Sequence, residues 1–149
     1  MTVMAKRELS PAEWLCKAEN YCAAAERCRG EVSAKLQQWG APAAIHANIL
    51  RALEERGFLD TKRYCRAFVH DKILFQGWGR IKVRMALHQK GLPTQAIEDG
   101  MSAVDDEAYS AVLRQVAAKK KGANREQLAR FLLQRGFSYD EIKAVLSLE

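Results

Sequence analysis

An internal repeat of 45 residues is the feature of this chain that most constrains its fold. When residues 59–103 are laid over residues 104–148 without a gap, nine of the 45 pairs are identical, whereas chance gives about three. The matches include Asp60/Asp105, Tyr64/Tyr109, Gly77/Gly122, Arg80/Arg125, Leu87/Leu132, Gly91/Gly136 and Ile97/Ile142. A looser copy lies upstream, where Tyr21, Leu36 and Gly40 align if gaps are allowed. Self-similarity at a fixed period of this length is typical of helical repeat arrays.

Each copy is predicted to form three short helices. In the second copy, Asp60 is a suitable cap for a helix that ends at Gly77, and Gly91 ends the next one. In the third copy, Asp105 is the equivalent cap, and Ser138 and Glu141 have the spacing of a capping box. No alternating pattern bounded by hairpin turns predicts a strand. We therefore expect an all-α chain of about nine helices without a β-sheet. Its predicted parts are a lead-in with the start of the first helix (1–16) and three-helix modules at 17–58, 59–103 and 104–149.

The positive charge of the chain is concentrated in its middle third. The net charge is +6 overall, yet residues 62–90 alone hold +7, because Asp71 is the only acid among eight basic residues. The residues before and after this segment are close to neutral. A solvated helix face usually interleaves both signs, so the imbalance favours an acidic or polyanionic partner.

The basic residues of the middle third recur at helical spacing. Lys62 and Arg66 lie four residues apart, as do Arg80 and Arg84, so each pair is expected on one helix face. We predict a surface for a protein partner or DNA, made by Lys62, Arg63, Arg66, Arg80, Lys82 and Arg84, with further contacts from Trp78, Lys119, Lys120, Lys121 and Arg125. Trp78 is included because Ala123 replaces it in the third copy.

Structural explanations of these residues remain open. The stripes are also compatible with a plain solvated face. Arg80 and Arg125 fall in the first turn of their helices, where the helix dipole disfavours a cation. A cation at this position indicates that a carboxylate binds it, either a carboxylate of this chain or one of a partner. The run Lys119–Lys121 is favourable at a helix end and needs no partner. The repeat-spaced tyrosines Tyr21, Tyr64 and Tyr109 are expected to pack between helices.

Catalytic and metal-binding patterns are not found. His46, His70 and His88 are isolated, and no nucleophile signature or phosphate-binding glycine loop is present. Cys16, Cys22 and Cys28 are six residues apart, which on one helix turns them to different sides, so we expect reduced thiols without a metal or disulfide. We therefore expect a non-enzymatic protein without a cofactor.

The sequence also favours a cytoplasmic location. No apolar run approaches the roughly 18 residues of a membrane span. The N-terminus lacks the apolar region of a secretory signal. We expect a protein that contacts no membrane and is monomeric.

Three segments resemble the RecX family, bacterial regulatory proteins that modulate the RecA recombinase. The sequence RGFLDTKRYCRAFV (56–69) is similar to the family's Gly-aromatic-aliphatic-Asp pattern and the helix after it. The sequence GWGRIKVRMALHQKGLP (77–93) is similar to its Gly-x-x-Arg-Ile pattern with a later Leu and Gly-aliphatic pair. Upstream, CRGEVSAKLQQWG (28–40) resembles its Glu-Leu-x-x-Lys-Leu segment. These positions are mostly caps, turns and core residues.

The resemblance implies an elongated, curved array of three-helix modules in the groove of the RecA–single-stranded-DNA filament. There, a RecX-like protein blocks filament extension or promotes disassembly. It thereby lowers recombinase, ATPase and co-protease activities in DNA repair, homologous recombination and the SOS response. The basic residues of the second module are then expected to contact RecA acids, DNA phosphates or both.

Three other functions are compatible with parts of the sequence. A DNA-binding repeat protein that acts without RecA would bind single- or double-stranded DNA without sequence preference and with strong salt dependence. A helical adaptor for an unrelated acidic protein would be indifferent to DNA. An enzyme would need convergent titratable groups, which the sequence does not provide.

Overall fold

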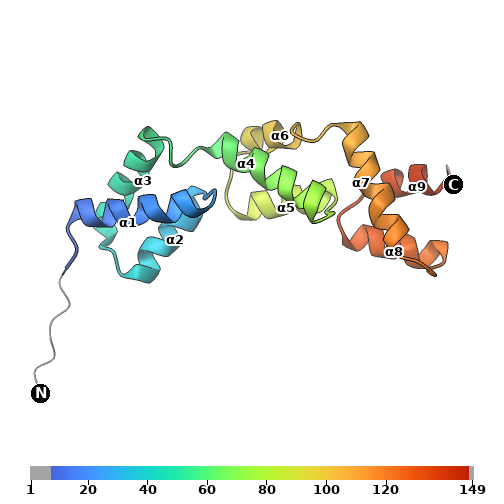
Figure 1. Ribbon diagram of the computed structural model, residues 1–149, viewed down its shortest axis with the longest axis horizontal. Helices are drawn as coiled ribbons and strands as arrows, with labels where there is room; N and C mark the ends of the chain where they lie inside the picture. The colour runs from blue at the N-terminus through green and yellow to red at the C-terminus, as the bar shows by residue number, and fades with distance from the viewer. Residues whose placement is uncertain (1–7, 148–149) are drawn as a thin grey trace, which may run out of the picture. The chain divides into compact units, whose positions relative to one another are not determined.

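The computed structural model describes residues 8–147, and within that range the chain is built from α-helices with no strand (Figure 1). This confirms the predicted all-α class and its nine helices. The helices are α1 (Pro11–Ala24), α2 (Arg29–Trp39), α3 (His46–Glu55), α4 (Thr61–His70), α5 (Arg80–Gln89), α6 (Thr94–Met101), α7 (Asp106–Lys119), α8 (Arg125–Gln134) and α9 (Tyr139–Ser147). A 3₁₀ turn over Ala43–Ile45 precedes α3, and a π-helical segment over Asp71–Phe75 extends α4.

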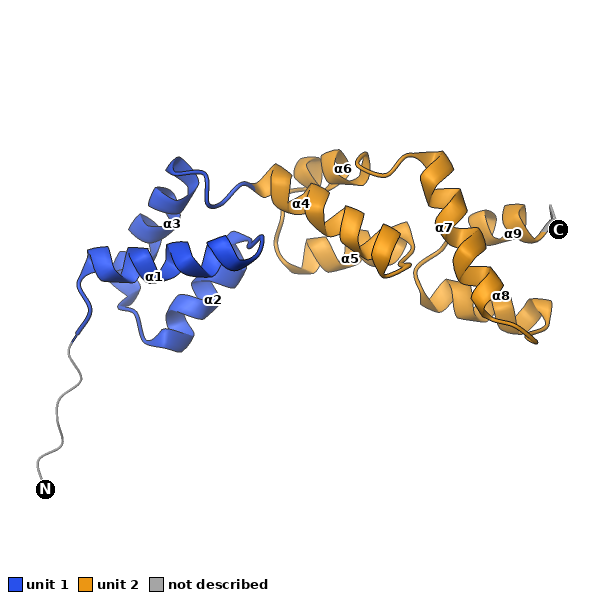
Figure 2. Cartoon of the chain, viewed as in Figure 1, with its two compact units in different colours: residues 1–60 blue, residues 61–149 orange. Residues whose placement is uncertain are grey.

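The chain divides into two compact units, residues 1–60 and 61–149 (Figure 2). The first unit contains α1 to α3, and the second contains α4 to α9. The helices thus follow one another in three groups of three, with the second and third groups in one unit. The predicted module boundaries themselves remain predictions.

Several predicted caps are present in the second unit. The Asp105 side chain accepts a hydrogen bond from the backbone N–H of Ala108, at 2.8 Å, and opens α7. Ser138 and Glu141 form the expected capping box, in which the N–H of Glu141 donates to the Ser138 hydroxyl at 3.1 Å. Gly77 ends the π-helical segment with φ of +70°, a backbone conformation that favours glycine.

Close packing of α4 on α6 forms the core of the second module. Val69 and Ile97 are fully buried between the helices. Gly100 lets α6 approach α4, because a Cβ at this position would lie 2.7 Å from Cβ of Cys65. The predicted packing role of the repeat-spaced tyrosines is confirmed for Tyr64 and Tyr109, which are buried.

The second and third modules are joined by backbone hydrogen bonds at the start of α5. The N–H of Gly79 donates to the carbonyl of Arg135 at 2.7 Å, and the N–H of Ile81 donates to Gly136 at 3.0 Å. In return, Nε of Arg135 donates to the carbonyl of Gly77 at 3.1 Å. The joint therefore fixes the start of α5 against the turn between α8 and α9.

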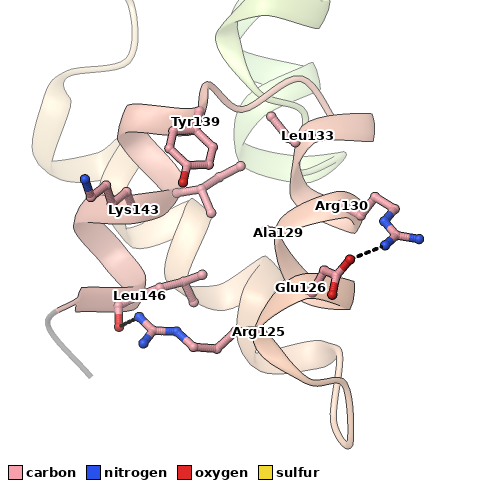
Figure 3. Close-up of a pocket in the computed structure, with 9 residues that line it drawn as sticks. Arg125, Glu126, Ala129, Arg130, Leu133, Tyr139, Lys143 and Leu146 are labelled. Atoms are coloured by element: carbon pink, nitrogen blue, oxygen red, sulfur yellow. Dashed lines mark hydrogen bonds and ion pairs between the residues drawn. The ribbon is translucent and has the colours of Figure 1, made fainter.

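A groove of about 440 Å³ lies between α8 and α9 in the third module (Figure 3). Ala129, Leu133, Ile142 and Leu146 are among the residues that line it. Leu133 is 46% exposed, so part of this apolar surface is uncovered.

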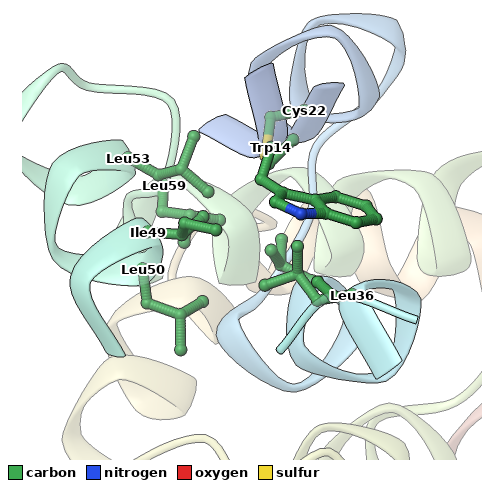
Figure 4. Close-up of a cluster of buried hydrophobic side chains, with 10 residues drawn as sticks. Trp14, Cys22, Leu36, Ile49, Leu50, Leu53 and Leu59 are labelled. Carbon is green, nitrogen blue, oxygen red and sulfur yellow. The ribbon is translucent and has the colours of Figure 1, made fainter. Parts of the chain in front are cut away.

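The first unit has its own hydrophobic core (Figure 4). Trp14 from α1, Leu36 from α2 and Leu53 from α3 meet there, and burial of such side chains stabilises the fold by about 1.5–3 kcal/mol each. The expectation that three cysteines share one helix is wrong, because α1 ends at Ala24 and Cys28 caps α2. Cys16 and Cys22 both lie on α1, and neither forms a disulfide within residues 8–147.

Candidate partner-binding surface

The basic residues of α5 are divided between two faces of the helix. Arg80 and Arg84 are four residues apart and share one face. Lys82 lies two positions from each of them, which on a helix places it on the other side. The arginines and the lysine therefore have different neighbours.

Two consecutive acids of α6 bind one arginine of α5 and one arginine of α4. Arg84 binds Glu98 through two hydrogen bonds of 3.0 Å. On α4, Arg66 binds Asp99 through bonds of 3.0 and 3.2 Å. These hydrogen bonds lower the pKa of the Glu98 and Asp99 carboxyl groups and raise the pKa of both guanidinium groups. Both pairs are largely exposed, so each adds little stability.

Arg80 is held by the third module. Its guanidinium donates to Asp106 at 2.7 Å and lies 3.9 Å from the Glu141 carboxylate. It also stacks over the Tyr109 ring, 3.9 Å from the ring centroid. The hydroxyl of Tyr109 accepts the backbone N–H of Arg80 at 3.0 Å, and burial raises the pKa of this phenol. The sequence left two explanations for a cation in this first turn, a carboxylate of the same chain or one of a partner. In the structure, Arg80 binds carboxylates of the same chain.

The high charge of residues 62–90 therefore overstates the net charge of the folded surface. The acids that bind these arginines come later in the chain, at positions 98, 99, 106 and 141. Extending the window only to residue 106 lowers its net charge from +7 to +3. The remaining excess is carried mostly by lysines.

A cluster of lysines and aromatic rings occupies the other side of the second module. We define this lysine–aromatic cluster as Phe68, Lys72, Trp78, Lys82 and Lys90. Nζ of Lys82 lies 4.2 Å from the Trp78 ring centroid, and Nζ of Lys72 lies 5.0 Å from it. The Phe68 and Trp78 rings meet edge to face, with centroids 6.3 Å apart. All five side chains are half-buried, so the cluster is still reached by solvent.

The charges of this cluster are only partly compensated within the chain. Lys72 lies 3.8 Å from the Asp71 carboxylate. Lys82 has no carboxylate of residues 8–147 within ion-pair distance, and its ammonium group lies over the Trp78 ring. A cation over an aromatic face is worth about 0.5–1 kcal/mol at such a site, which orders the lysine and leaves its charge in place.

The other predicted residues are distributed around the second unit. Lys62 and Arg63 are exposed on α4. Lys119 lines a cleft of about 280 Å³ together with Gln76 and Gly77, the two residues that precede Trp78 in the chain. Lys120 lies 4.8 Å from the Phe131 ring centroid, and Lys121 is exposed. Arg125 donates to the backbone carbonyl of Leu146 at 2.8 Å.

Phe68, Lys72 and Lys90 were not among the contact residues predicted from the sequence. A similar group in the first unit was not predicted either: there, Lys17 and Lys35 lie 4.5 and 5.7 Å from the Trp39 ring centroid. The signal was available: Phe68 and Lys72 are four residues apart, as are Lys35 and Trp39. Such pairs share a helix face.

Residues 8–147 contain no group of three or more His, Cys, Asp or Glu residues that could hold a metal ion. In the same range, no helix is long and apolar enough to cross a membrane.

Comparisons with known proteins identify similar sequences. A family profile described as "RecX, second three-helix domain" matches residues 60–101. "Regulatory protein RecX" of Leptothrix cholodnii is 34% identical over 140 residues, covering 89% of this chain and 86% of the relative. A protein of the same name from Clostridium botulinum is 38% identical over 104 residues, covering 63% of this chain and 48% of the relative. The alignment therefore spans only about half the length of the Clostridium protein.

Solved structures support the fold. "Crystal structure of RecX from Lactobacillus salivarius" superposes with a TM-score of 0.80, covering 93% of this chain and 95% of that one at 21% identity. "Crystal structure of regulatory protein RecX" superposes with a TM-score of 0.79 over 97% of this chain, at 20% identity.

Proposed function

This chain belongs to the RecX family of regulatory proteins, and from this premise we propose that it regulates the RecA recombinase. We propose that it binds the RecA–single-stranded-DNA filament and lowers recombinase, ATPase and co-protease activities. It does so by blocking filament extension or promoting disassembly, and not by catalysis. The cytoplasm, where RecA acts, is the proposed location.

The lysine–aromatic cluster is the observation that best supports this proposal. Lys72 and Lys82 present ammonium groups beside Trp78, and Lys82 makes no ion pair with a carboxylate of residues 8–147. A filament of protein and DNA offers carboxylates and phosphates to such cations. We propose the cluster, with Lys62 and Arg63, as the main contact surface.

The three arginines proposed from the sequence have a different main role. Arg66, Arg80 and Arg84 each bind at least one carboxylate of this chain. We propose that they hold α4, α5 and the third module in place. Lys119, Lys120, Lys121 and Arg125 remain proposed as peripheral contacts.

A second candidate function is RecA-independent DNA binding. Single-stranded nucleic acid is commonly bound by aromatic side chains that stack on bases and by cations that contact phosphates. The pairing of Trp78 with Lys82 is compatible with this chemistry. Such binding would be insensitive to sequence and would weaken steeply with salt.

A titration of RecA's DNA-dependent ATP hydrolysis tests the first function. Inhibition well below one copy per recombinase is expected, since a few molecules would stop a cooperative filament. Full hydrolysis at equimolar protein would overturn the proposal. Fluorescence anisotropy with labelled single-stranded DNA, without RecA, then tests the second function, and a steep loss of binding with salt is its expected signature.

A further inference from the structure

The groove between α8 and α9 is a second exposed surface, distinct from the lysine–aromatic cluster. Leu133 is 46% exposed and Tyr139 is 64% exposed at one end of the groove. Figure 3 shows these two side chains close together, with Lys143 on one side and Arg130 on the other. The groove thus combines an apolar floor with a basic rim.

The repeat relates this groove to a cleft in the second module. In the repeat, each residue of α8 and α9 is equivalent to the residue 45 positions earlier, in or beside α5 and α6. Five residues that line the groove then coincide with residues that line the α5–α6 cleft of about 650 Å³: Arg125 with Arg80, Glu126 with Ile81, Ala129 with Arg84, Lys143 with Glu98, and Leu146 with Met101. The two surfaces are therefore equivalent faces of successive modules.

In the second module, the start of α7 supplies acids to this face. Asp105 and Asp106, at the beginning of α7, line the opposite wall of the cleft together with Glu141. Asp106 accepts the 2.7 Å hydrogen bond from Arg80. The fold itself thus provides an example of a carboxylate that binds an arginine of such a face.

In the third module, the equivalent face is lined by α8 and α9 alone among the described residues, and no following helix supplies acids to it. The guanidinium of Arg125 donates to a neutral acceptor, the carbonyl of Leu146. Lys143 replaces the acid Glu98 and has no carboxylate of residues 8–147 within ion-pair distance. Arg130 is the exception on this rim, because it binds Glu126 at 2.8 Å.

Over the nine positions that line the groove, the net charge rises from +1 in the second module to +2 in the third. Ala129 replaces Arg84 and Leu133 replaces His88, which adds apolar side chains, whereas Glu126 replaces Ile81 and adds an acid. The change from Glu98 to Lys143 removes the acid that neutralised the equivalent face. Carboxylates on a ligand would complement this charge, and apolar side chains would fill the floor.

We propose that the α8–α9 groove docks a helix of the protein partner whose first turn carries Asp or Glu residues. Its carboxylates would lie at Arg125 and Lys143, as the Asp106 carboxylate lies at Arg80 in the second module. The identity of the partner, the protein component of the RecA filament, rests on the function proposed above. The chemistry of the ligand rests on the groove alone.

A variant that transplants the second module's ion pair tests the proposal. Ala129→Arg with Lys143→Glu places the Arg84–Glu98 pair at the equivalent positions, and the second module already folds with that pair. Co-sedimentation with RecA–DNA filaments is expected to weaken at least tenfold. Anisotropy with single-stranded DNA alone should change less than twofold, because the lysine–aromatic cluster is intact. Undiminished co-sedimentation of a folded variant would overturn the docking site.

A peptide experiment separates this proposal from the proposed function. The probe is a peptide of residues 104–119, which contains the acidic start of α7, titrated into the ¹⁵N-labelled full chain. Amide shifts at Leu133 and Lys143 are expected, and they should be weaker for the peptide with Asp105→Asn, Asp106→Asn and Glu107→Gln. No shift at about 1 mM peptide would overturn the groove's chemistry. If the wild type does not bind filaments at all, the proposed function is wrong. The peptide titration then still shows whether the groove binds an acidic helix.

Sedimentation velocity tests whether a second copy of the chain occupies the groove instead. A wild type that dimerises, combined with a monomeric Ala129→Arg, Lys143→Glu variant, would assign the groove to self-association and overturn the docking of a different protein. A wild type that stays monomeric supports the proposal.

Discussion

The backbone of Gly79, at the start of α5, lies directly against the backbone of Gly136, in the turn between α8 and α9. A Cβ on Gly79 would lie 2.1 Å from the carbonyl carbon of Gly136. This approach allows the hydrogen bonds from Gly79 and Ile81 that join the second and third modules. Both glycines are therefore needed for the joint, whatever their local conformations.

Gly79→Ala is expected to destabilise the second unit. The added methyl group meets backbone that has no room to move away, and overpacking of this kind costs about 1–3 kcal/mol. Urea unfolding followed by circular dichroism measures the loss. Gly91→Ala is a suitable comparison, because a Cβ there has open space and only the backbone, with φ of +79°, is strained. Equal losses for the two variants would contradict a steric role for Gly79.

Arg84 and Glu98 are expected to show modest coupling. Their two hydrogen bonds are exposed, so a double-mutant cycle with Arg84→Met and Glu98→Gln should give about 0.3–1 kcal/mol. The coupling should fall as salt is added, because solvent-exposed charges are screened. A coupling energy of zero at low salt would mean that the pair does not help to hold α5 against α6.

The stability of the second unit is expected to fall in acid. Glu98 and Asp99 have lowered pKa values in the folded chain because Arg84 and Arg66 donate hydrogen bonds to them. Their contribution is complete above the unfolded-state pKa values of about 4 and is lost as the pH falls through the lower folded-state values.

Urea midpoints measured from pH 7 to pH 3 check this expectation. The variant with Glu98→Gln and Asp99→Asn should begin less stable at pH 7 and lose less stability on acidification. Parallel curves for the wild type and the variant would show that other carboxyl groups account for the acid sensitivity.

The fold was predictable from the sequence because its signals are local or repeated. The cap at Asp105, the capping box at Ser138 and the turn at Gly77 depend on neighbouring residues, and all three are present. The 45-residue repeat then extends these local signals to the third module. The π-helical segment at Asp71–Phe75 was not predicted, because no spacing rule distinguishes it from the end of α4.

The candidate site was predictable only in part, because charge pairing depends on tertiary contacts. Arg84 and Glu98 are 14 residues apart, and Arg80 and Asp106 are 26 apart, so counting charges in a window separates the partners. Helical spacing grouped Arg80 with Arg84 correctly but gave no sign of the acids that face them. The proximity of Lys82 to Trp78 depends on the turn before α5.

Reversing the lysine charges is expected to separate binding from folding. Lys72→Glu with Lys82→Glu should weaken filament binding at least tenfold, because two cations of the proposed contact surface become anions. Helix content should remain that of the wild type, since only one of these lysines has a carboxylate partner in the described chain. Filament co-sedimentation and far-ultraviolet circular dichroism measure the two effects.

Two further variants give this test its controls. Arg51→Glu with Arg114→Glu makes the same change in net charge at exposed helix positions, and it should leave filament binding nearly unchanged. Arg80→Glu with Arg84→Glu instead places new acids against Asp106 and Glu98, so its first effect should be lower stability. If the arginine variant remained as stable as the wild type and alone lost filament binding, the contact surface would be the arginine face and not the lysine–aromatic cluster.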